Sequence, residues 1–385
     1  MIVNVKSETG LSGFYVVFDG STMNEKPGWY GISHLMEHLV CKSFEHLQNL
    51  YQQKNIKWNA YTSNTEVVFY MKGLDRHINE QKKEFLDLLL SYEPTQEQLD
   101  NEKKIVLEEY KMSFNSQGSA HYMNLQRKMF NYYNPIGLRS DIEKFTLQDC
   151  KEYLDLYYKN PTRIINISKF NDFESDVKFR EKVEVKPFEI NFNANLYIIT
   201  SDDETDVPEG MIPLEIITDY KNKVSIINSS PVLTTDFASA SFLCEMLGAG
   251  LNSPLYKEVR EKLGLVYSIN CFADKLNSKS CVIGIMTDTS AKNVTIVQNQ
   301  IKMVLENKEK YLTQERFDIV KEEYITRLEE ADILNYSNVG RYMSEQEWRI
   351  ESIIHTITLK DVYDIVDKYL KWDNIYKSVD KTEFQ

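Results

Sequence analysis

The most constraining feature of this 385-residue chain is that its first half recurs in its second half. Three separate segments reappear in the same order, each at an offset of roughly 210 residues. The matched pairs are Phe145–Asp149 with Ile357–Asp361, Thr95–Asp100 with Thr313–Asp318, and His34–Leu39 with Phe242–Leu247. One match could arise by chance, but three in the same order indicate a tandem duplication that gives two homologous domains.

Each copy has the pattern of an α+β domain, because strand-like runs alternate with helical stretches and predict a sheet packed with helices. The strand-like runs are Gly13–Phe18, Trp58–Lys72, Arg163–Ser168, Val224–Ser229, Val266–Phe272 and Cys281–Thr287. Between the copies, residues 201–210 are acidic, contain Pro208 and Gly210 and lack an apolar period, which is typical of a linker. We expect domains at residues 1–185 and 213–385, joined by a linker at 186–212.

Three helix starts can be predicted from their capping residues. Thr146 and Thr358 precede the helical stretches of one matched pair of segments, so we expect both to be N-caps. Thr95 and Gln98 have the spacing of a capping box, which predicts another helix that starts near Thr95.

Charge and composition exclude several classes of protein. Lys and Arg total 45 against 58 Asp and Glu, a net charge of −13 with no segregated basic patch, so we expect no nucleic-acid partner. The apolar runs are far shorter than the roughly 20 residues that span a bilayer, so we expect no membrane segment. The N-terminal residues resemble no secretory signal or transit peptide, and the five cysteines are scattered without a CxxC pair. These features predict a globular cytoplasmic protein.

The pentapeptide His34-Leu35-Met36-Glu37-His38 carries the clearest chemical signal. On a helix, histidines at positions i and i+4 project from one face, so both imidazoles can reach one metal ion at about 2.0–2.1 Å. Glu37 lies beside them, where its carboxylate can take a proton from a water that the metal activates. The spacing is HxxEH, the inverzincin signature. The plainer interpretation is two surface histidines beside a solvated glutamate.

A catalytic zinc ion needs three protein ligands and an open fourth position, and the helix near Thr95 offers candidates for the third. Glu102 and Glu109 lie two turns apart on its largely apolar stripe, whereas Glu108 falls on the polar stripe. The apolar stripe also contains Leu99, Ile105, Val106 and Met112. Buried carboxylates are costly without a cation or donors. We assign Glu109 as the third ligand and Glu102 as an acceptor that orients a histidine or the water, and the exchange of these two roles stays open.

The second copy serves as an internal control. It has Phe242 and Met246 in place of the two histidines, and Val320 and Arg327 in place of the two glutamates. A purely structural role would let both copies keep or lose these residues together. The pattern therefore indicates chemistry in the first copy alone.

Together these residues resemble the pitrilysin/insulinase family of zinc metallopeptidases, particularly its half-length members related to mitochondrial processing peptidase. The resemblance covers nearly the whole chain. Residues 102–109 resemble the family's Glu-x6-Glu element, whose second glutamate is the metal ligand. After His38, residues 40–44 replace an FKGT-like stretch, and the spacing of 109 − 38 = 71 residues to Glu109 is slightly shorter than usual.

The resemblance extends to a sheet-edge segment of the family. The matching residues are Asn59, Ala60, Tyr61 and Thr62. The match implies that this strand binds the substrate, and β-augmentation by a peptide is the mode that an edge strand offers. An ordinary half-buried strand is the alternative.

A second-domain signature of the family matches residues 247–268. In the family, its arginine and the tyrosine seven residues later contact the substrate near the scissile bond, which implies these roles for Arg260 and Tyr267. The local pattern predicts a helix that starts at Ser253 and Pro254 and stops at Gly264, followed by a strand that contains the tyrosine. Taken alone, the two residues would be a solvated arginine and a core tyrosine.

The resemblance implies a zinc-dependent endopeptidase with one Zn²⁺ per chain that cleaves peptides or unfolded segments. Glu37 would be the general base, and Arg260 and Tyr267 would donate to the oxyanion. In the family two such halves close around the substrate, so we expect a homodimer, or a heterodimer with a related half. One alternative is a non-catalytic assembly or core subunit of a peptidase-like complex. Another is a structural zinc site, which leaves Glu37 unexplained and lacks a fourth protein ligand.

Overall fold

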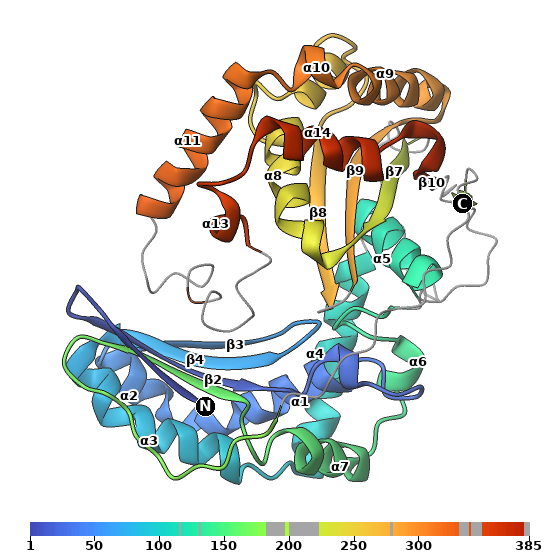
Figure 1. The fold of residues 1–385 in the computed structure, drawn as a ribbon. Coiled ribbons are helices and arrows are strands. Elements are labelled where there is room, and N and C mark those ends of the chain that lie inside the picture. Colours follow the sequence, from blue (N-terminus) through green and yellow to red (C-terminus); the bar gives the residue numbers. More distant parts are fainter. Residues whose placement is uncertain are drawn as a thin grey trace. The chain divides into compact units, whose positions relative to one another are not determined.

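The chain forms two compact units, each built on a five-stranded sheet (Figure 1). The computed structural model describes residues 1–114, 117–130, 132–181, 197–199, 223–277, 280–330, 339 and 349–380. The first unit comprises residues 1–112, 133–185 and 331–345, and the second comprises residues 113–132, 186–330 and 346–385.

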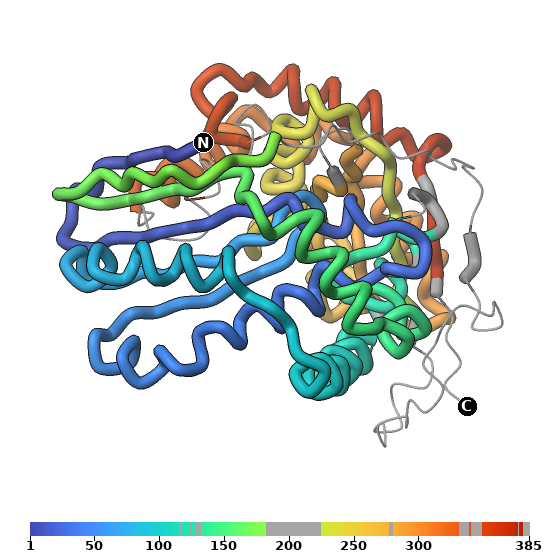
Figure 2. The backbone as a smooth tube through the Cα atoms, turned by 90° about the horizontal axis from the view of Figure 1, so that it is seen from below, coloured from blue at the N-terminus to red at the C-terminus, as the bar shows by residue number. Residues whose placement is uncertain are grey.

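The sheet of the first unit has the strand order β1–β5–β2–β4–β3. Its strands are β1 (Ile2–Lys6), β2 (Leu11–Phe18), β3 (Lys57–Thr62), β4 (Val67–Leu74) and β5 (Arg163–Ser168). β1 pairs with β5 in parallel, as Figure 2 shows, and the other neighbours are antiparallel. The expected single run Trp58–Lys72 is a hairpin of β3 and β4, because Ser63 turns the chain and its amide donates to the Glu66 carbonyl. In the described part of the chain, β3 pairs only with β4 and is an edge strand.

The sheet of the second unit repeats this order strand for strand, as β6–β10–β7–β9–β8. Its strands are β6 (Tyr197–Ile199), β7 (Lys223–Val232), β8 (Ile269–Asn277), β9 (Ser280–Ser290) and β10 (Tyr376–Asp380). β6 and β10 again form a parallel pair, and the remaining pairs are antiparallel. The expected duplication and the α+β class are thus confirmed. The strand expected at Val266–Phe272 begins only at Ile269.

β6 falls inside the stretch expected to link the two copies, residues 186–212. The acidic segment 201–210 and the expected domain limits at residues 185 and 213 lie outside the described residues. These limits therefore stay predictions.

Helices of the same copy cover one face of each sheet. In the first half these are α1 (Ile32–Cys41), α2 (Gln48–Gln53), α3 (Asp75–Ser91), α4 (Gln96–Phe114), α6 (Arg139–Ile142) and α7 (Leu147–Tyr157). In the second half they are α8 (Phe237–Gly248), α9 (Val294–Glu306), α10 (Lys308–Tyr311), α11 (Gln314–Glu330), α13 (Ile350–Ile353) and α14 (Leu359–Tyr369). Alternate strand residues reach this layer: Phe14 packs on Phe85 of α3 with ring centroids 6.3 Å apart. No helix in the described ranges is long and apolar enough to cross a membrane.

The helix caps predicted at Thr95, Thr146 and Thr358 are confirmed. Thr146 and Thr358 each form a capping box at the start of α7 and α14. At the start of α4, the Gln98 amide donates to Thr95 Oγ1 at 3.3 Å, and the Thr95 amide donates to Gln98 Oε1 at 3.1 Å. Local sequence signals thus determine where these helices begin.

The opposite face of each sheet is contacted by residues from the other half of the chain. In the second unit, α5 (Gln117–Phe130) lies against β7 and β9, where Leu125 packs with Ile227 and Val282. In the first unit, Val339 packs with apolar residues of β2 and β5. Residues 113–132 are grouped with the second unit, and residues 331–345, of which the structure describes Val339, are grouped with the first. The two segments occupy matching positions in the two repeats.

Candidate metal centre

The helix α1 carries the HxxEH residues, and its start is fixed by two glycines. Gly31 precedes the helix with a φ of 102°, a left-handed conformation that glycine adopts without strain. The backbone also passes closely by Gly137, where a Cβ would lie 2.3 Å from the Cα of Gly31. The buried face of the helix includes Leu35, Met36, Leu39 and Val40. This face fixes the rotation of α1 and turns both histidines toward α4.

Glu25 supplies the capping acceptor that Gly31 lacks. Its carboxylate accepts from the amides of Gly31 at 3.0 Å and Ser33 at 2.9 Å, and from the Ser33 hydroxyl. These bonds satisfy amides that the first turn of a helix leaves unpaired. Burial raises the pKa of Glu25 to about 8. Sequence reasoning missed this residue, because a cap so far upstream follows no spacing rule.

The structure brings His34, His38 and Glu109 together. Their possible ligand atoms all lie within 4.8 Å of one another, and among the described residues this is the one such group. Oε2 of Glu109 lies 3.4 Å from Nε2 of His34 and 3.6 Å from Nε2 of His38. Burial, reinforced by the neighbouring His38, lowers the pKa of His34 to about 3. His34 is therefore neutral, which is the form that binds metal ions.

Glu102 lies beside the same pair of helices but contacts a different atom of His38. Its Oε2 lies 3.1 Å from Nδ1 of His38, and its Oε1 lies 2.7 Å from Nζ of Lys42. The side chain is only 4% exposed. This geometry favours Glu109 as the ligand and Glu102 as the orienting acceptor.

The prediction of which α4 residues are buried is wrong in part. Ile105 and Met112 are 44% and 70% exposed. The buried line runs instead through Leu99, Glu102, Val106 and Tyr110. This rotation places Glu109 at the edge of the line, and its side chain is 41% exposed rather than buried. Glu108 is exposed, as expected, and pairs with Lys111 at 2.6 Å.

Glu37 is buried beside this cluster and is held by the end of strand β3. The hydroxyl of Thr62 donates to its Oε2 at 2.7 Å. Burial raises the pKa of Glu37, and the hydrogen bonds from Thr62 act in the opposite direction. Thr62 was expected only among the substrate-binding residues, so this contact with Glu37 is an addition. The other three, Asn59, Ala60 and Tyr61, lie on the same edge strand.

Arg260 and Tyr267 lie together in the second unit. The guanidinium of Arg260 lies 4.5 Å from the ring centre of Tyr256 and 5.6 Å from that of Tyr267. Arg260 belongs to a π-helical turn, Tyr256–Glu261. Tyr267 is 83% exposed and lies in a bend. The expectation of a strand residue is therefore wrong, because β8 starts two residues later.

The helix that precedes Tyr267 begins and ends where expected, but without the expected cap. It starts at Pro254 and stops before Gly264, whose φ is 62°. The hydroxyl of Ser253 is buried and has no hydrogen-bond partner. This hydroxyl therefore does not cap the helix.

The second copy has an ion pair at the place that corresponds to the cluster. Phe242 and Met246 are fully buried in α8. Arg327 of α11, the counterpart of Glu109, pairs at 2.8 Å with Glu245, the counterpart of Glu37. The second repeat therefore has the same framework with an ion pair and buried apolar residues in place of the possible metal ligands.

The chain thus contains two domains of the same fold, and only the first has a cluster of possible metal ligands among the described residues. This combination defines a class of protein. Comparison with protein families identifies that class. Residues 2–136 match the model of Insulinase (Peptidase family M16), and residues 146–324 match that of Peptidase M16 inactive domain. The chain therefore belongs to peptidase family M16, the pitrilysin/insulinase family.

Similar proteins span nearly the whole chain. An uncharacterized zinc protease of Rickettsia bellii is 21% identical over 366 residues, which cover 89% of this chain and 86% of that protein. The structure of a protease from Helicobacter pylori matches with a TM-score of 0.76 at 19% identity, over 99% of this chain and 96% of that one. A chain of complex III2 from Candida albicans with Inz-5 bound matches with a TM-score of 0.75 at 14% identity, over 100% and 94% of the two chains. At these identities the structures show a shared fold.

Proposed function

We propose that this protein is a zinc-dependent endopeptidase that hydrolyses peptides or unfolded segments. The observation that carries the proposal is the convergence of His34, His38 and Glu109 beside the buried carboxylate of Glu37. The family and the relative named as a zinc protease support it.

The residues present fit a zinc ion. Two imidazoles and one carboxylate form a donor set that suits zinc, and three protein ligands leave the fourth position open, as in catalytic sites. His34 is neutral, and Glu102 contacts Nδ1 of His38. The Nε2 atom of each histidine therefore faces Glu109. We propose one Zn²⁺ per chain, held by these three residues.

Different residues of the chain would have separate roles in peptide hydrolysis. A bound zinc ion supplies Lewis acidity that polarises a carbonyl and acidifies a water molecule. Glu37 takes the proton of the attacking water and returns it to the leaving amine, while the Thr62 hydroxyl fixes its carboxylate. Arg260 and Tyr267 donate to the carbonyl oxygen as negative charge develops there. The edge strand β3, with Asn59, Ala60 and Tyr61, offers backbone groups to an extended peptide.

A non-catalytic core subunit is the second candidate function. The match to a chain of complex III2 favours it, because that relative belongs to a large assembly. The retention of His34, Glu37, His38 and Glu109 favours the peptidase, since a core subunit has no use for the full set.

Hydrolysis of a mixed library of quenched peptides tests the proposal. The zinc-loaded full chain is expected to cleave peptides at internal bonds, and removal of the metal with a chelator is expected to stop cleavage. Readdition of zinc should restore it. Zinc-loaded protein that cleaves nothing, alone or at high concentration, would favour the core-subunit function.

We further propose that the active form is a homodimer, or a heterodimer with a related half, in which the metal centre of one chain works with Arg260 and Tyr267 of the other. Glu37→Gln and Arg260→Ala chains, each inactive alone, should then complement each other. Random reassociation gives half mixed dimers, each with one intact site, so about a quarter of the wild-type rate is expected. Each variant mixed with itself is the control. A fully active monomer, or no activity in the mixture, would contradict the shared site.

A further inference from the structure

We propose that Lys42 is a positioning residue of the metal centre. Its ammonium group holds the Glu102 carboxylate in the orientation that fixes the His38 imidazole and leaves Glu109 to serve the metal. This inference rests on the proposed function of the cluster as a zinc site.

The spacing of residues on two facing helices creates the arrangement. His34, His38 and Lys42 follow one another at intervals of four, so they share one helical face. Lys42 is the C-cap of α1 and still has helical dihedrals, with φ −63° and ψ −24°. Its side chain therefore leaves the helix one turn beyond His38, on the same side as both histidines.

The facing helix α4 presents Glu102 and Glu109, which are seven residues or two turns apart. Each glutamate contacts two residues of the facing row: Glu109 contacts both histidines, and Glu102 contacts His38 and Lys42. Lys42 is thus the last member of a row whose first two members are the possible metal ligands.

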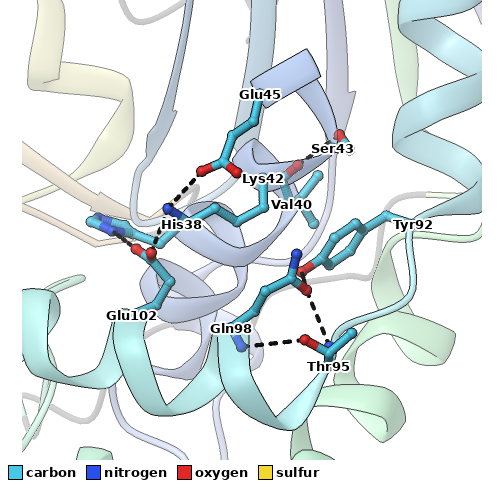
Figure 3. A network of polar contacts seen from close by, with 9 residues as sticks. All are labelled: His38, Val40, Lys42, Ser43, Glu45, Tyr92, Thr95, Gln98 and Glu102. Carbon is cyan, nitrogen blue, oxygen red and sulfur yellow. Dashed lines mark hydrogen bonds and ion pairs between the residues drawn. The ribbon is translucent and has the colours of Figure 1, made fainter.

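Lys42 has a specific task because Glu102 is almost completely buried. A carboxylate that is 4% exposed has lost most of its hydration and needs charged or hydrogen-bonding partners in compensation. Figure 3 shows how these partners are divided: Lys42 reaches one oxygen of Glu102 and His38 the other. With one oxygen held at 2.7 Å by the ammonium, the carboxylate plane is fixed and the second oxygen points at Nδ1 of His38.

This contact also explains how two similar glutamates take different roles. Both oxygens of Glu102 are engaged, whereas Glu109 sends Oε2 toward the two Nε2 atoms. A partner behind a metal-binding histidine fixes its ring orientation and raises metal affinity. Lys42 acts on the metal through Glu102 and His38, without touching the ligand positions itself.

The test measures zinc affinity of the full-length chain by competition with a chromogenic chelator. Lys42→Met keeps the apolar stem and removes the charge, and we expect about a tenfold loss of affinity, within the range for partners of metal ligands. Glu45→Gln is the matched control. Glu45 is the exposed second partner of Lys42, at 3.1 Å, and its loss leaves the pair with Glu102 intact. We expect this variant to bind zinc within twofold of wild type.

A double variant separates positioning from a general effect of charge. If Lys42 acts through Glu102, Lys42→Met combined with Glu102→Gln should bind zinc no more weakly than Glu102→Gln alone. Thermal unfolding of each variant confirms that it is folded. Wild-type affinity in Lys42→Met, or fully additive losses in the double variant, would overturn the inference. The wild-type measurement distinguishes failure of this inference from failure of the proposed function. A wild-type chain that binds no zinc would overturn both, whereas a wild-type chain that binds zinc leaves only the role of Lys42 to be decided by the variants.

Discussion

Replacement of Glu37 by glutamine is expected to lower kcat by roughly 10²- to 10⁴-fold, the usual contribution of a general acid-base residue. Zinc binding should stay at the wild-type level, because Glu37 is not among the three residues that gather their ligand atoms. The amide has nearly the size of the carboxylate and can still accept from Thr62, so the buried site should keep its packing. It cannot take a proton from water at neutral pH, which removes the step assigned to Glu37.

The second repeat provides the control for this variant. Glu245 occupies the matching position in α8, and there it pairs with Arg327 at 2.8 Å. Glu245→Gln should leave the turnover of peptides unchanged. Cleavage and bound zinc are measured on the same preparations, by fluorescence and by elemental analysis. Normal turnover in Glu37→Gln would contradict the mechanism even if zinc is bound.

This comparison also separates the alternatives that the sequence leaves open. If the zinc site were structural, the wild-type chain would bind zinc without cleaving peptides, and Glu37→Gln would bind zinc equally well. In a core subunit, the wild-type chain would itself be inactive. Only the proposed peptidase predicts loss of turnover with retention of the metal.

Much of the fold could be predicted because the sequence contains it twice. The strand-like runs and the capped helices recur with the same order, and the two sheets have the same strand order. The capping boxes at Thr146 and Thr358 were predictable because a cap depends on residues within one turn.

The exchange of segments between the repeats could not be predicted in this way. α5 has a helical pattern in the sequence, but its periodicity does not tell which of two equivalent sheets it covers. Both sheets offer an apolar face of β-branched and aromatic residues, so the choice depends on long-range packing. A local pattern contains no information about that choice.

The candidate site shows the same limit at the scale of single residues. His34 and His38 were predictable from helical spacing, and the pair Glu102 and Glu109 from two turns of one helix. The stripe assignment was less accurate, since α4 is rotated enough to expose Ile105 and Met112. The supporting contacts of Glu25 and Thr62 join residues that are separate in the chain, and no spacing rule connects them. The sequence analysis also did not single out Lys42, although its position four residues after His38 places it on the same helical face.

Three glutamates of α4 allow the metal ligand to be identified directly. Glu109→Gln is expected to weaken zinc binding by more than about 100-fold, beyond the 10- to 100-fold range for residues that only orient a ligand. It removes one of three protein ligands and leaves two imidazoles, a set that is too small for a catalytic zinc site. Peptide hydrolysis should be lost with the metal.

The neighbouring glutamates serve as graded controls for this variant. Glu102→Gln should weaken zinc binding by about 10- to 100-fold, because it removes the charged partner of His38 but no ligand. Glu108→Gln should bind zinc as the wild type does, since Glu108 is exposed and pairs only with Lys111 in the described contacts. The expected order of loss is therefore Glu109, Glu102, Glu108, as measured by chelator competition. If Glu102→Gln were the most damaging, the roles of the two glutamates would be exchanged. Glu102, with one oxygen on His38 and the other on Lys42, would then have to leave both partners to reach the metal.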